Sequence, residues 1–375
     1  MGAGGDPKSV SYLESARVLL EKIAGQHRLR TLLPDAPKYT IDFSTNDYLA
    51  LSTDSRVVEA LRRAKRVGSG GARLLGGRDR DHWLLEEELA RFVNRERALI
   101  FSSGYMAAMG AITVLAKTVT AAYSDELNHA CLIDGLRETK LRRVIYPHGK
   151  LPPKSEREHR ALIVTESIFS MDGDRADVEA ILADMNEGDV LLLDEAHALG
   201  VTGPQGRGLA SHVPDERIVI MGTLSKSFGS QGGFVAGPAP LIELLINTAR
   251  TFIFDTALPP ALAVAARVGL YLAMAADDRR ERIKRNVAIL REGVAALGYP
   301  AIGQLGPIVP VIIGDEEAAK NVEATLVEGH IYAPAVRPPT VPVGTSRLRL
   351  SIRSDHTELQ MEQFLHALKG VTVPK

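Results

Sequence analysis

VLLLDEAH at residues 190–197 and IVIMGTLSK at residues 218–226 are two apolar runs that each end in polar side chains. Consecutive aliphatic residues of this kind are typical of strands that are buried on both faces of a parallel sheet. Ligands of open α/β sheets bind beyond the carboxyl ends of such strands. The two runs therefore predict two strands that deliver their polar residues to one site. These residues are Asp194, His197, Thr223 and Lys226.

These four side chains match the chemical needs of pyridoxal phosphate, a cofactor that carries an aldehyde. A lysine, here Lys226, forms a Schiff base with the aldehyde and moves the Cα proton once an amino acid has displaced it. A carboxylate, here Asp194, keeps the pyridine nitrogen protonated, so that the ring acts as an electron sink. Thr223 is placed to contact the phosphate. A lysine after an apolar strand is usually a solvated loop residue, so the prediction depends on the combination.

The tetrapeptide at residues 194–197 also occurs at the magnesium-binding strand end of helicase-like ATPases. That chemistry requires a phosphate-binding loop of the form G-x-x-x-x-G-K-[ST] upstream. The single Gly-Lys pair of this chain ends at Lys150 and is followed by leucine. The glycine cluster at residues 68–71 also lacks the third glycine of a dinucleotide-binding fingerprint, because Arg73 stands in its place. Both nucleotide-binding interpretations are therefore weak.

Length and composition describe an ordinary globular protein. The 375 residues exceed the size of a usual single core, so about two domains are expected. A net charge of −1 gives no electrostatic reason to expect nucleic acid or an anionic membrane as a partner. The single cysteine, Cys131, excludes an intramolecular disulfide, and no Cys/His cluster has zinc spacing, so no metal is expected. Neither a signal peptide nor an apolar run of transmembrane length is found, which makes the cytoplasm the expected location.

Strand and helix patterns alternate through residue 237. This alternation predicts a mostly parallel sheet covered by helices, which is a doubly wound α/β domain. Residues 12–33 predict an N-terminal helix, and residues 261–297 predict one long helix that links two domains. The predicted domains are an N-terminal arm (1–40), a large α/β domain (41–265), and a linking helix with a small α+β domain (266–375).

Three further segments carry candidate ligand-binding groups. A strand at residues 98–105 turns through glycine into a helix, and such a turn offers free backbone N–H groups to a phosphate. His129 follows the next strand, where it either caps or bonds the loop, or stacks its ring on a pyridine face. In RLRLSIR at residues 347–353 the alternation of a strand puts three arginines on one face. These arginines either solubilise an exposed face or include one that pairs bidentately with a substrate carboxylate.

Together these motifs resemble the α-oxoamine synthases, pyridoxal-phosphate enzymes of the aspartate-aminotransferase fold type. The resemblance covers nearly the whole chain. It is carried by NDYL (46–49), SGY (103–105), HA (129–130), FSMDGD (169–174), DEAH (194–197), TLSK (223–226) and RLR (347–349). It implies fold type I, with a mostly parallel seven-stranded sheet and a smaller C-terminal α+β domain. Members of the family condense an amino acid with an acyl-CoA thioester and release carbon dioxide.

One segment narrows the resemblance within the family. RPPTVPVGT at residues 337–345 looks like the member of biotin biosynthesis that joins L-alanine to a pimeloyl thioester, carried by coenzyme A or by another carrier. Relatives that use glycine, serine or a different acyl thioester are the first alternative. The second alternative is a catalytically silent dimer that only binds ligand. The presence together of four candidate catalytic residues argues against it: Lys226, Asp194, His197 and His129. The family also implies a homodimer with its active site at the interface.

By position, the resemblance implies roles at the cofactor ring. Lys226 is the Schiff-base lysine and Asp194 the partner of the pyridinium nitrogen. His129 stacks on the ring. His197 and Ser170 lie near the phenolic oxygen of the cofactor.

The resemblance also implies contacts with the phosphate and the substrates. The backbone of Gly104 and Tyr105 binds the phosphate together with Thr223, and Thr256 reaches the phosphate of the neighbouring subunit. The residues expected to contact substrate are Arg28, Asn46, Thr340 and Arg349.

Overall fold

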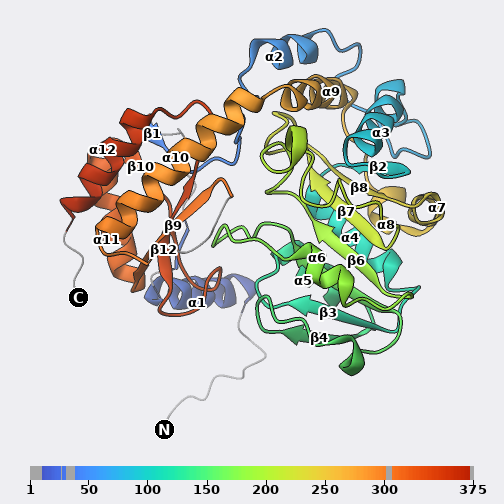
Figure 1. The fold of residues 1–375 in the computed structure, drawn as a ribbon, viewed down its shortest axis with the longest axis horizontal. Coiled ribbons are helices and arrows are strands. Elements are labelled where there is room, and N and C mark those ends of the chain that lie inside the picture. The colour runs from blue at the N-terminus through green and yellow to red at the C-terminus, as the bar shows by residue number, and fades with distance from the viewer. Residues whose placement is uncertain (1–10, 27, 31–38, 301–305, 372–375) are drawn as a thin grey trace.

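The computed structural model describes residues 11–26, 28–30, 39–300 and 306–371. Two lobes are visible in Figure 1, a larger one that holds most of the central strands and a smaller one built mainly from the C-terminal part of the chain. Residues 1–10 and 31–38 of the predicted N-terminal arm lie outside the described residues.

The larger lobe contains a seven-stranded sheet with the strand order β2-β8-β7-β6-β5-β3-β4. Its strands are β2 (Arg97–Phe101), β3 (Ala121–Asp125), β4 (Arg142–Tyr146), β5 (Ala161–Glu166), β6 (Val190–Asp194), β7 (Ile218–Thr223) and β8 (Gly233–Gly237). Every pair from β4 to β7 is parallel, whereas β8 is antiparallel to both of its neighbours. The mostly parallel seven-stranded sheet is therefore confirmed.

Helices cover both faces of this sheet, which explains why its central strands are apolar throughout. Alternate residues of β6 enter different cores: Leu192 packs in one, and Leu191 and Leu193 pack in the other. The helices of this lobe are α2 (Ser55–Arg62), α3 (Arg80–Phe92), α4 (Gly104–Leu115), α5 (Ala130–Arg137), α6 (Val178–Ala183), α7 (Ala239–Thr248), α8 (Arg250–Ile253) and α9 (Pro260–Met274), with short 3₁₀ turns η1 (Lys154–Glu156) and η2 (Pro204–Gly206).

The smaller lobe contains a three-stranded antiparallel sheet with the order β11-β12-β9. Its strands are β9 (Ile308–Gly314), β11 (Ala335–Val336) and β12 (Ser346–Ser351), and its helices are α10 (Asp277–Ala296), α11 (Glu316–Glu328) and α12 (Glu358–Lys369). A separate pair joins β1 (Ile41–Asp42) to β10 (Ile331–Tyr332) in parallel. This pair brings a segment from the start of the chain into the smaller lobe, where it leads toward the site.

The single long helix predicted for residues 261–297 is wrong. Two helices, α9 and α10, occupy this region and meet at a bend of 72°. Arg280, which is 5% exposed, stabilises the bend by donating to the carbonyl of Ala273 (2.6 Å) at the end of α9 and to that of Gly200 (3.1 Å). These bonds satisfy a carbonyl that the end of a helix leaves without an intrahelical partner.

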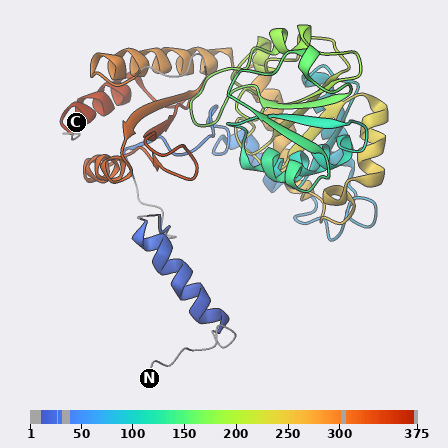
Figure 2. The same cartoon turned by 90° about the horizontal axis from the view of Figure 1, so that it is seen from below.

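The N-terminal helix is shorter than predicted. The helix α1 (Tyr12–Gly25) begins as expected but ends at Gly25, where glycine weakens a helix, and the predicted end at residue 33 lies outside the described residues. The helix projects away from both lobes (Figure 2), and all of its residues are exposed.

No single helix within the described residues has the length and apolar composition needed to cross a membrane. The helices α9 and α10 reach that length and composition only when they are taken together across their bend.

Candidate active site

The turns that follow β6 and β7 bring a histidine and a lysine into direct contact. The two strands pair in parallel register, so their carboxyl ends lie side by side. Nζ of Lys226 lies 2.8 Å from Nε2 of His197. Gly200, whose φ is +86°, lets the turn after β6 pack against Ser227 beside Lys226, because a Cβ at this position would lie 2.3 Å from the Cβ of Ser227. Two of the four residues predicted from the strand ends therefore meet.

The environment of this pair favours neutral forms. Burial lowers the pKa of Lys226 from 10.5 to about 8, although the nearby carboxylates of Asp194 and Glu166 act in the opposite direction. Burial, together with the charge of Lys226, lowers the pKa of His197 well below its usual value of 6.5. The unprotonated amine is the nucleophilic form of a lysine. Lys226 is therefore more readily available as a nucleophile and a base near neutral pH than a solvated lysine.

A chain of hydrogen bonds leads from His197 into the smaller lobe. Nδ1 of His197 lies 2.6 Å from the hydroxyl of Tyr48, which in turn lies 3.2 Å from Oδ1 of Asn46. The same Oδ1 accepts hydrogen bonds from Nη1 of Arg349 (3.1 Å) and from Oγ of Ser351 (2.9 Å). Asn46 and Arg349, two residues predicted to contact substrate, are thus linked to the predicted cofactor lysine.

The arginines of β12 are buried, which excludes the interpretation that they solubilise an exposed face. Arg347 is 4% exposed and pairs with Asp172, and Arg349 is 6% exposed. Nε of Arg349 donates to the carbonyl of Ser170 (2.6 Å), and its Nη1 also donates to Oγ of Ser351 (2.7 Å). Its Nη2 has no hydrogen-bond partner among the described residues, so this nitrogen can still bind a carboxylate.

Asp194 is a buried carboxylate with one oxygen available. It ends β6 in register with Glu166 at the end of β5, and its Oδ1 accepts the N–H of Ala196 (2.8 Å). Its Oδ2 accepts no hydrogen bond from any residue that the structure describes. Burial raises the pKa of Asp194, although the amine of Lys226 attracts the ionised form. A protonated ring nitrogen would complete this carboxylate, so Asp194 fits the pyridinium side of pyridoxal phosphate.

His129 lies at the start of α5 and caps this helix. Its Nδ1 accepts the N–H of Cys131 (3.2 Å) and lies 3.0 Å from the Sγ of the same residue. The backbone N–H of His129 donates to Oε1 of Glu166 (2.6 Å). The capping interpretation is therefore confirmed. The side chain is nevertheless exposed, so that capping does not prevent the ring from stacking on a flat ligand.

The N-terminus of α4 lies against Thr223 and fits a phosphate group. Ser103 caps this helix by accepting the N–H of Met106 (3.2 Å), while the N–H groups of Gly104 and Tyr105 belong to the first turn and have no partner within the helix. A Cβ at Gly104 would lie only 3.3 Å from the Cβ of Thr223. Free N–H groups beside a hydroxyl are a common anion-binding arrangement.

The remaining three residues predicted to bind ligands also lie outside the hydrogen-bond chain of Lys226. Thr256 is exposed. Arg28 pairs with Glu316 at 3.0 Å. Arg28 and Thr340 line a cavity of about 230 Å³ together with Met171, which belongs to the same loop as Ser170.

Two residues of the site are missing from the sequence-based prediction. Tyr48 is fully buried and joins His197 to Asn46, and burial raises the pKa of its hydroxyl to about 12, so that it stays protonated. Glu166 binds the backbone of His129, and burial and Asp194 raise its pKa well above the usual value. Glu166 ends an apolar strand as Asp194 does, and this shared pattern was the available signal.

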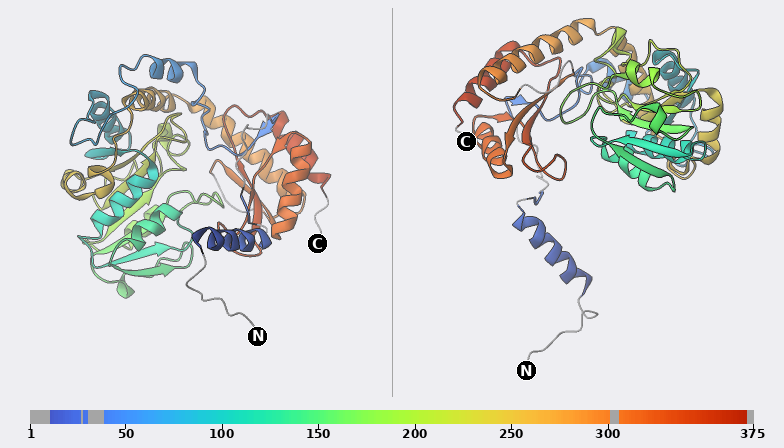
Figure 3. Two further views of the ribbon diagram at one scale, coloured as in Figure 1. Left: turned by 180° about the vertical axis from the view of Figure 1, so that it is seen from behind. Right: turned by 60° about the horizontal axis from the view of Figure 1, so that its bottom comes forward.

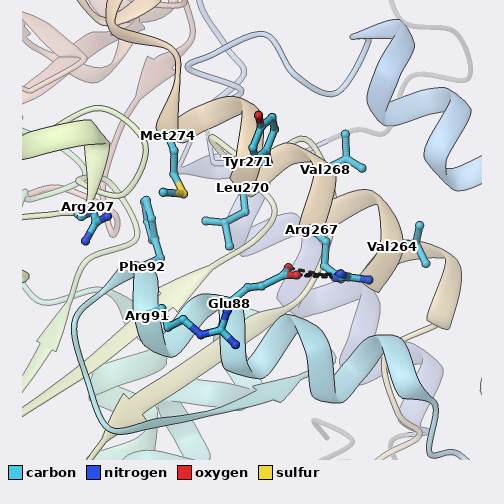
Figure 4. Close-up of a pocket in the computed structure, with 10 residues that line it drawn as sticks. All are labelled: Glu88, Arg91, Phe92, Arg207, Val264, Arg267, Val268, Leu270, Tyr271 and Met274. Atoms are coloured by element: carbon cyan, nitrogen blue, oxygen red, sulfur yellow. Dashed lines mark hydrogen bonds and ion pairs between the residues drawn. The ribbon is translucent and has the colours of Figure 1, made fainter.

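A groove between α3 and α9 is separate from these residues (Figure 4). Its volume is about 510 Å³, and Phe92, Leu270 and Met274 contribute to an apolar lining beside an ion pair between Glu88 and Arg267 (2.8 Å). None of the residues predicted to bind cofactor or substrate lines it. Within the described part of the chain, no group of three or more His, Cys, Asp or Glu side chains could hold a metal ion.

Comparison with known proteins gives the family of the chain. Residues 38–368 match the model of the aminotransferase class I and II family. The 8-amino-7-oxononanoate synthase of Saccharophagus degradans is 39% identical over 97% of this chain and 94% of its own length. That of Methylococcus capsulatus is 42% identical over 90% of each chain.

A solved structure agrees with this relationship. Serine palmitoyltransferase from S. paucimobilis, with pyridoxal phosphate and myriocin bound, has a TM-score of 0.85 and 29% identity, and the match covers 95% of this chain and 96% of that one. Lys226, Asp194 and the α4 N-terminus fit the parts of pyridoxal phosphate, the cofactor bound in that structure. The chain belongs to the aminotransferase class I and II family and is a pyridoxal-phosphate-dependent enzyme of the α-oxoamine synthase type.

Proposed function

We propose that this enzyme joins L-alanine to a pimeloyl thioester and forms 8-amino-7-oxononanoate for biotin biosynthesis. The carboxyl group of alanine leaves as carbon dioxide, and the carrier, coenzyme A or an acyl carrier, leaves as a thiol. The main support for this proposal is the hydrogen-bond chain between Lys226 and Arg349. It fixes the position of a reactive amine relative to a guanidinium that can bind the carboxylate of the amino acid. The identity of 39% and 42% to two 8-amino-7-oxononanoate synthases supports the choice of substrates.

The residues at the ends of the strands handle the cofactor ring and the moving proton. When bound, pyridoxal phosphate supplies an aldehyde and a ring that withdraws electrons from the substrate Cα. Lys226 would hold the aldehyde carbon until the amino acid displaces it, and its freed amine would then remove the Cα proton and later return a proton, which the lowered pKa of this amine favours. Asp194 holds the proton on the pyridine nitrogen. His129 lies against the ring face, and His197 and Ser170 are proposed to bind the phenolic oxygen.

The phosphate and the substrates are assigned to groups around this centre. The N–H groups of Gly104 and Tyr105 and the hydroxyl of Thr223 hold the phosphate, and Thr256 is assigned to the phosphate of a second subunit. Two of the residues proposed to contact substrate, Arg349 and Asn46, lie at the far end of the series of hydrogen bonds that starts at Lys226. The other two, Arg28 and Thr340, line the cavity beside Met171, which we propose receives part of the acyl substrate.

The choice of amino acid is tested by comparing alanine, glycine and serine with pimeloyl-CoA as the acyl donor. With enzyme loaded with pyridoxal phosphate, we expect kcat/KM for alanine to exceed that for glycine by roughly 10-fold or more, which is the usual contribution of one methyl group to discrimination. We also expect it to exceed that for serine, because the serine hydroxyl would leave water without gaining a hydrogen-bond partner in a site that fits a methyl group. Carbon dioxide release is measured for each pair, with octanoyl-CoA as the control for the acyl chain. A preference for glycine or serine would assign the enzyme to another reaction of the family. Cofactor binding without turnover would favour the silent binding protein.

Assembly as a homodimer is part of the proposal, and α1 supports it. Four apolar side chains on one face of this helix, Leu13, Leu19, Leu20 and Ile23, are between 39% and 60% exposed, and the helix projects away from the body in two views (Figures 2 and 3). An exposed apolar face of this size favours contact with another chain. The cytoplasmic location remains a prediction from the sequence.

Light scattering tests the dimer. We expect a mass of twice the 40.5 kDa of one chain, and we expect Leu20→Lys to shift the protein toward monomer by placing a charge on the apolar face of α1. Leu359→Lys, at a position that is 62% exposed in α12, is the matched control and should leave the mass unchanged. A wild-type mass equal to one chain would contradict the dimer.

A further inference from the structure

The loop at residues 168–175 carries Ser170 and is attached to both lobes. On the side of the smaller lobe, Arg349 donates to the carbonyl of Ser170 (2.6 Å) and Arg347 pairs with Asp172. On the side of the large sheet, the loop is held through Asp174. Nε2 of His148 lies 2.7 Å from Oδ2 of Asp174. The position of Ser170 therefore depends on contacts from two directions.

His148 is itself firmly attached to the end of β3. Its Nδ1 lies 3.0 Å from Oδ1 of Asp125, the last residue of this strand, and its backbone N–H donates to Oε1 of Glu126 (2.9 Å). The N–H of Gly149 donates to the other oxygen of Asp125 (2.9 Å). His148 thus connects the end of β3 to the 168–175 loop.

The ring of His148 is suited to this bridge. Each ring nitrogen faces a carboxylate oxygen, and only the protonated ring has an N–H on both nitrogens. The carboxylates of Asp125 and Asp174 raise its pKa to about 10, which agrees with a protonated ring at neutral pH. Phe169, also in the loop, packs against the ring at a centroid distance of 4.4 Å and an interplanar angle of 86°.

Backbone hydrogen bonds within the loop connect Asp174, which contacts His148, to the segment that holds Ser170. The carbonyl of Asp174 accepts the N–H of Phe169 (3.0 Å), and the N–H of Gly173 donates to the carbonyl of Phe169 (2.9 Å). Oδ1 of Asp174 is buried and has no hydrogen-bond partner among the described residues. The carboxylate of Asp174 therefore relies on His148 for its ion pair.

We propose that His148 is a positioning residue, which bridges Asp125 and Asp174 and so holds the 168–175 loop where Ser170 can bind the cofactor and support Arg349. This role rests on the proposed function, because it takes Ser170 and Arg349 as ligand-binding residues. His148 itself contacts neither substrate nor cofactor. Its loss affects the amino acid site through the carbonyl of Ser170, which accepts from Nε of Arg349.

Hydrogen exchange and kinetics of His148→Asn test the proposal. An asparagine cannot bridge two carboxylates with two charged N–H groups, so we expect exchange of the loop amides at residues 169–174 to rise by roughly 10-fold or more. We expect KM for the amino acid to rise by roughly 10-fold, while kcat changes less than about threefold, because the weakened contact acts on substrate binding. The amides of β5 and β6 should exchange as in the wild type.

Two further variants separate positioning from general destabilisation. Asp174→Asn removes the loop end of the bridge and should reproduce the loop exchange and the rise in KM, which keeps the test open if His148→Asn folds poorly. His212→Asn is the matched control, because His212 faces Glu179 at 3.6 Å with a side chain that is 55% exposed. It should change neither quantity. Wild-type loop exchange and wild-type KM in His148→Asn would overturn the proposal, and the exchange measurement stays valid even if the enzyme uses another substrate.

Discussion

Replacing Lys226 with alanine is expected to lower turnover of the amino acid and the acyl thioester by roughly 10⁴-fold or more, because it removes a nucleophile and a proton carrier at once. The visible absorption band that pyridoxal phosphate shows on binding to the lysine should also disappear. His197 should respond as well. The charge of Lys226 contributes to the lowered pKa of His197, so that pKa should rise in the variant. Steady-state carbon dioxide release and an absorption spectrum measure the first two effects.

Two controls make this result specific to the lysine amine. Lys226→Arg keeps a positive charge, but its guanidinium does not lose its proton near neutral pH, so it should be as inactive as the alanine variant. Lys284→Ala removes an exposed lysine that pairs with Glu281 (2.6 Å) and should retain full turnover. Steady-state turnover by Lys226→Ala without an added amine would show that another group carries the reaction.

The residues at the strand ends were predictable because apolar runs in the sequence show where the buried strands end. Apolar runs identify β6 and β7, and parallel strands of one sheet must end at the same edge, so Asp194, His197, Thr223 and Lys226 were expected together. The same reasoning applied to β5 would have identified Glu166, which pairs in register with Asp194.

The rest of the site depends on contacts that periodicity does not encode. Tyr48 meets His197 across 149 positions of the chain, and Arg349 meets Asn46 across 303. Such partners are set by how the two lobes pack, because the alternation of β12 shows that its arginines share a face but not whether that face is buried. The bend between α9 and α10 was also missed, although Asp277 and Asp278 provide the acidic first turn that is typical of a new helix.

The second large effect is expected at Asp194. Replacing it with asparagine should lower kcat by roughly 10³-fold, within the range that proton placement contributes to catalysis, because a neutral amide cannot hold the proton on the pyridine nitrogen. The fold should tolerate the change, since the amide oxygen can still accept the N–H of Ala196 that Oδ1 accepts at 2.8 Å. Single-turnover measurements of Cα proton release, compared with the affinity for pyridoxal phosphate, show whether chemistry or binding is affected.

The other end of the same strand provides the matched control for this experiment. Asp189 precedes β6 and is also buried, but its Oδ1 accepts the N–H of Ala161 (2.8 Å), and it lies at the edge of the sheet opposite to Lys226. Asp189→Asn should lower stability without lowering kcat by more than about twofold, because its carboxylate oxygens accept the backbone N–H groups of Ala161 and Asn186 away from the site. If Asp194→Asn retained kcat within about tenfold of the wild type, the carboxylate would have a structural role like that of Asp189.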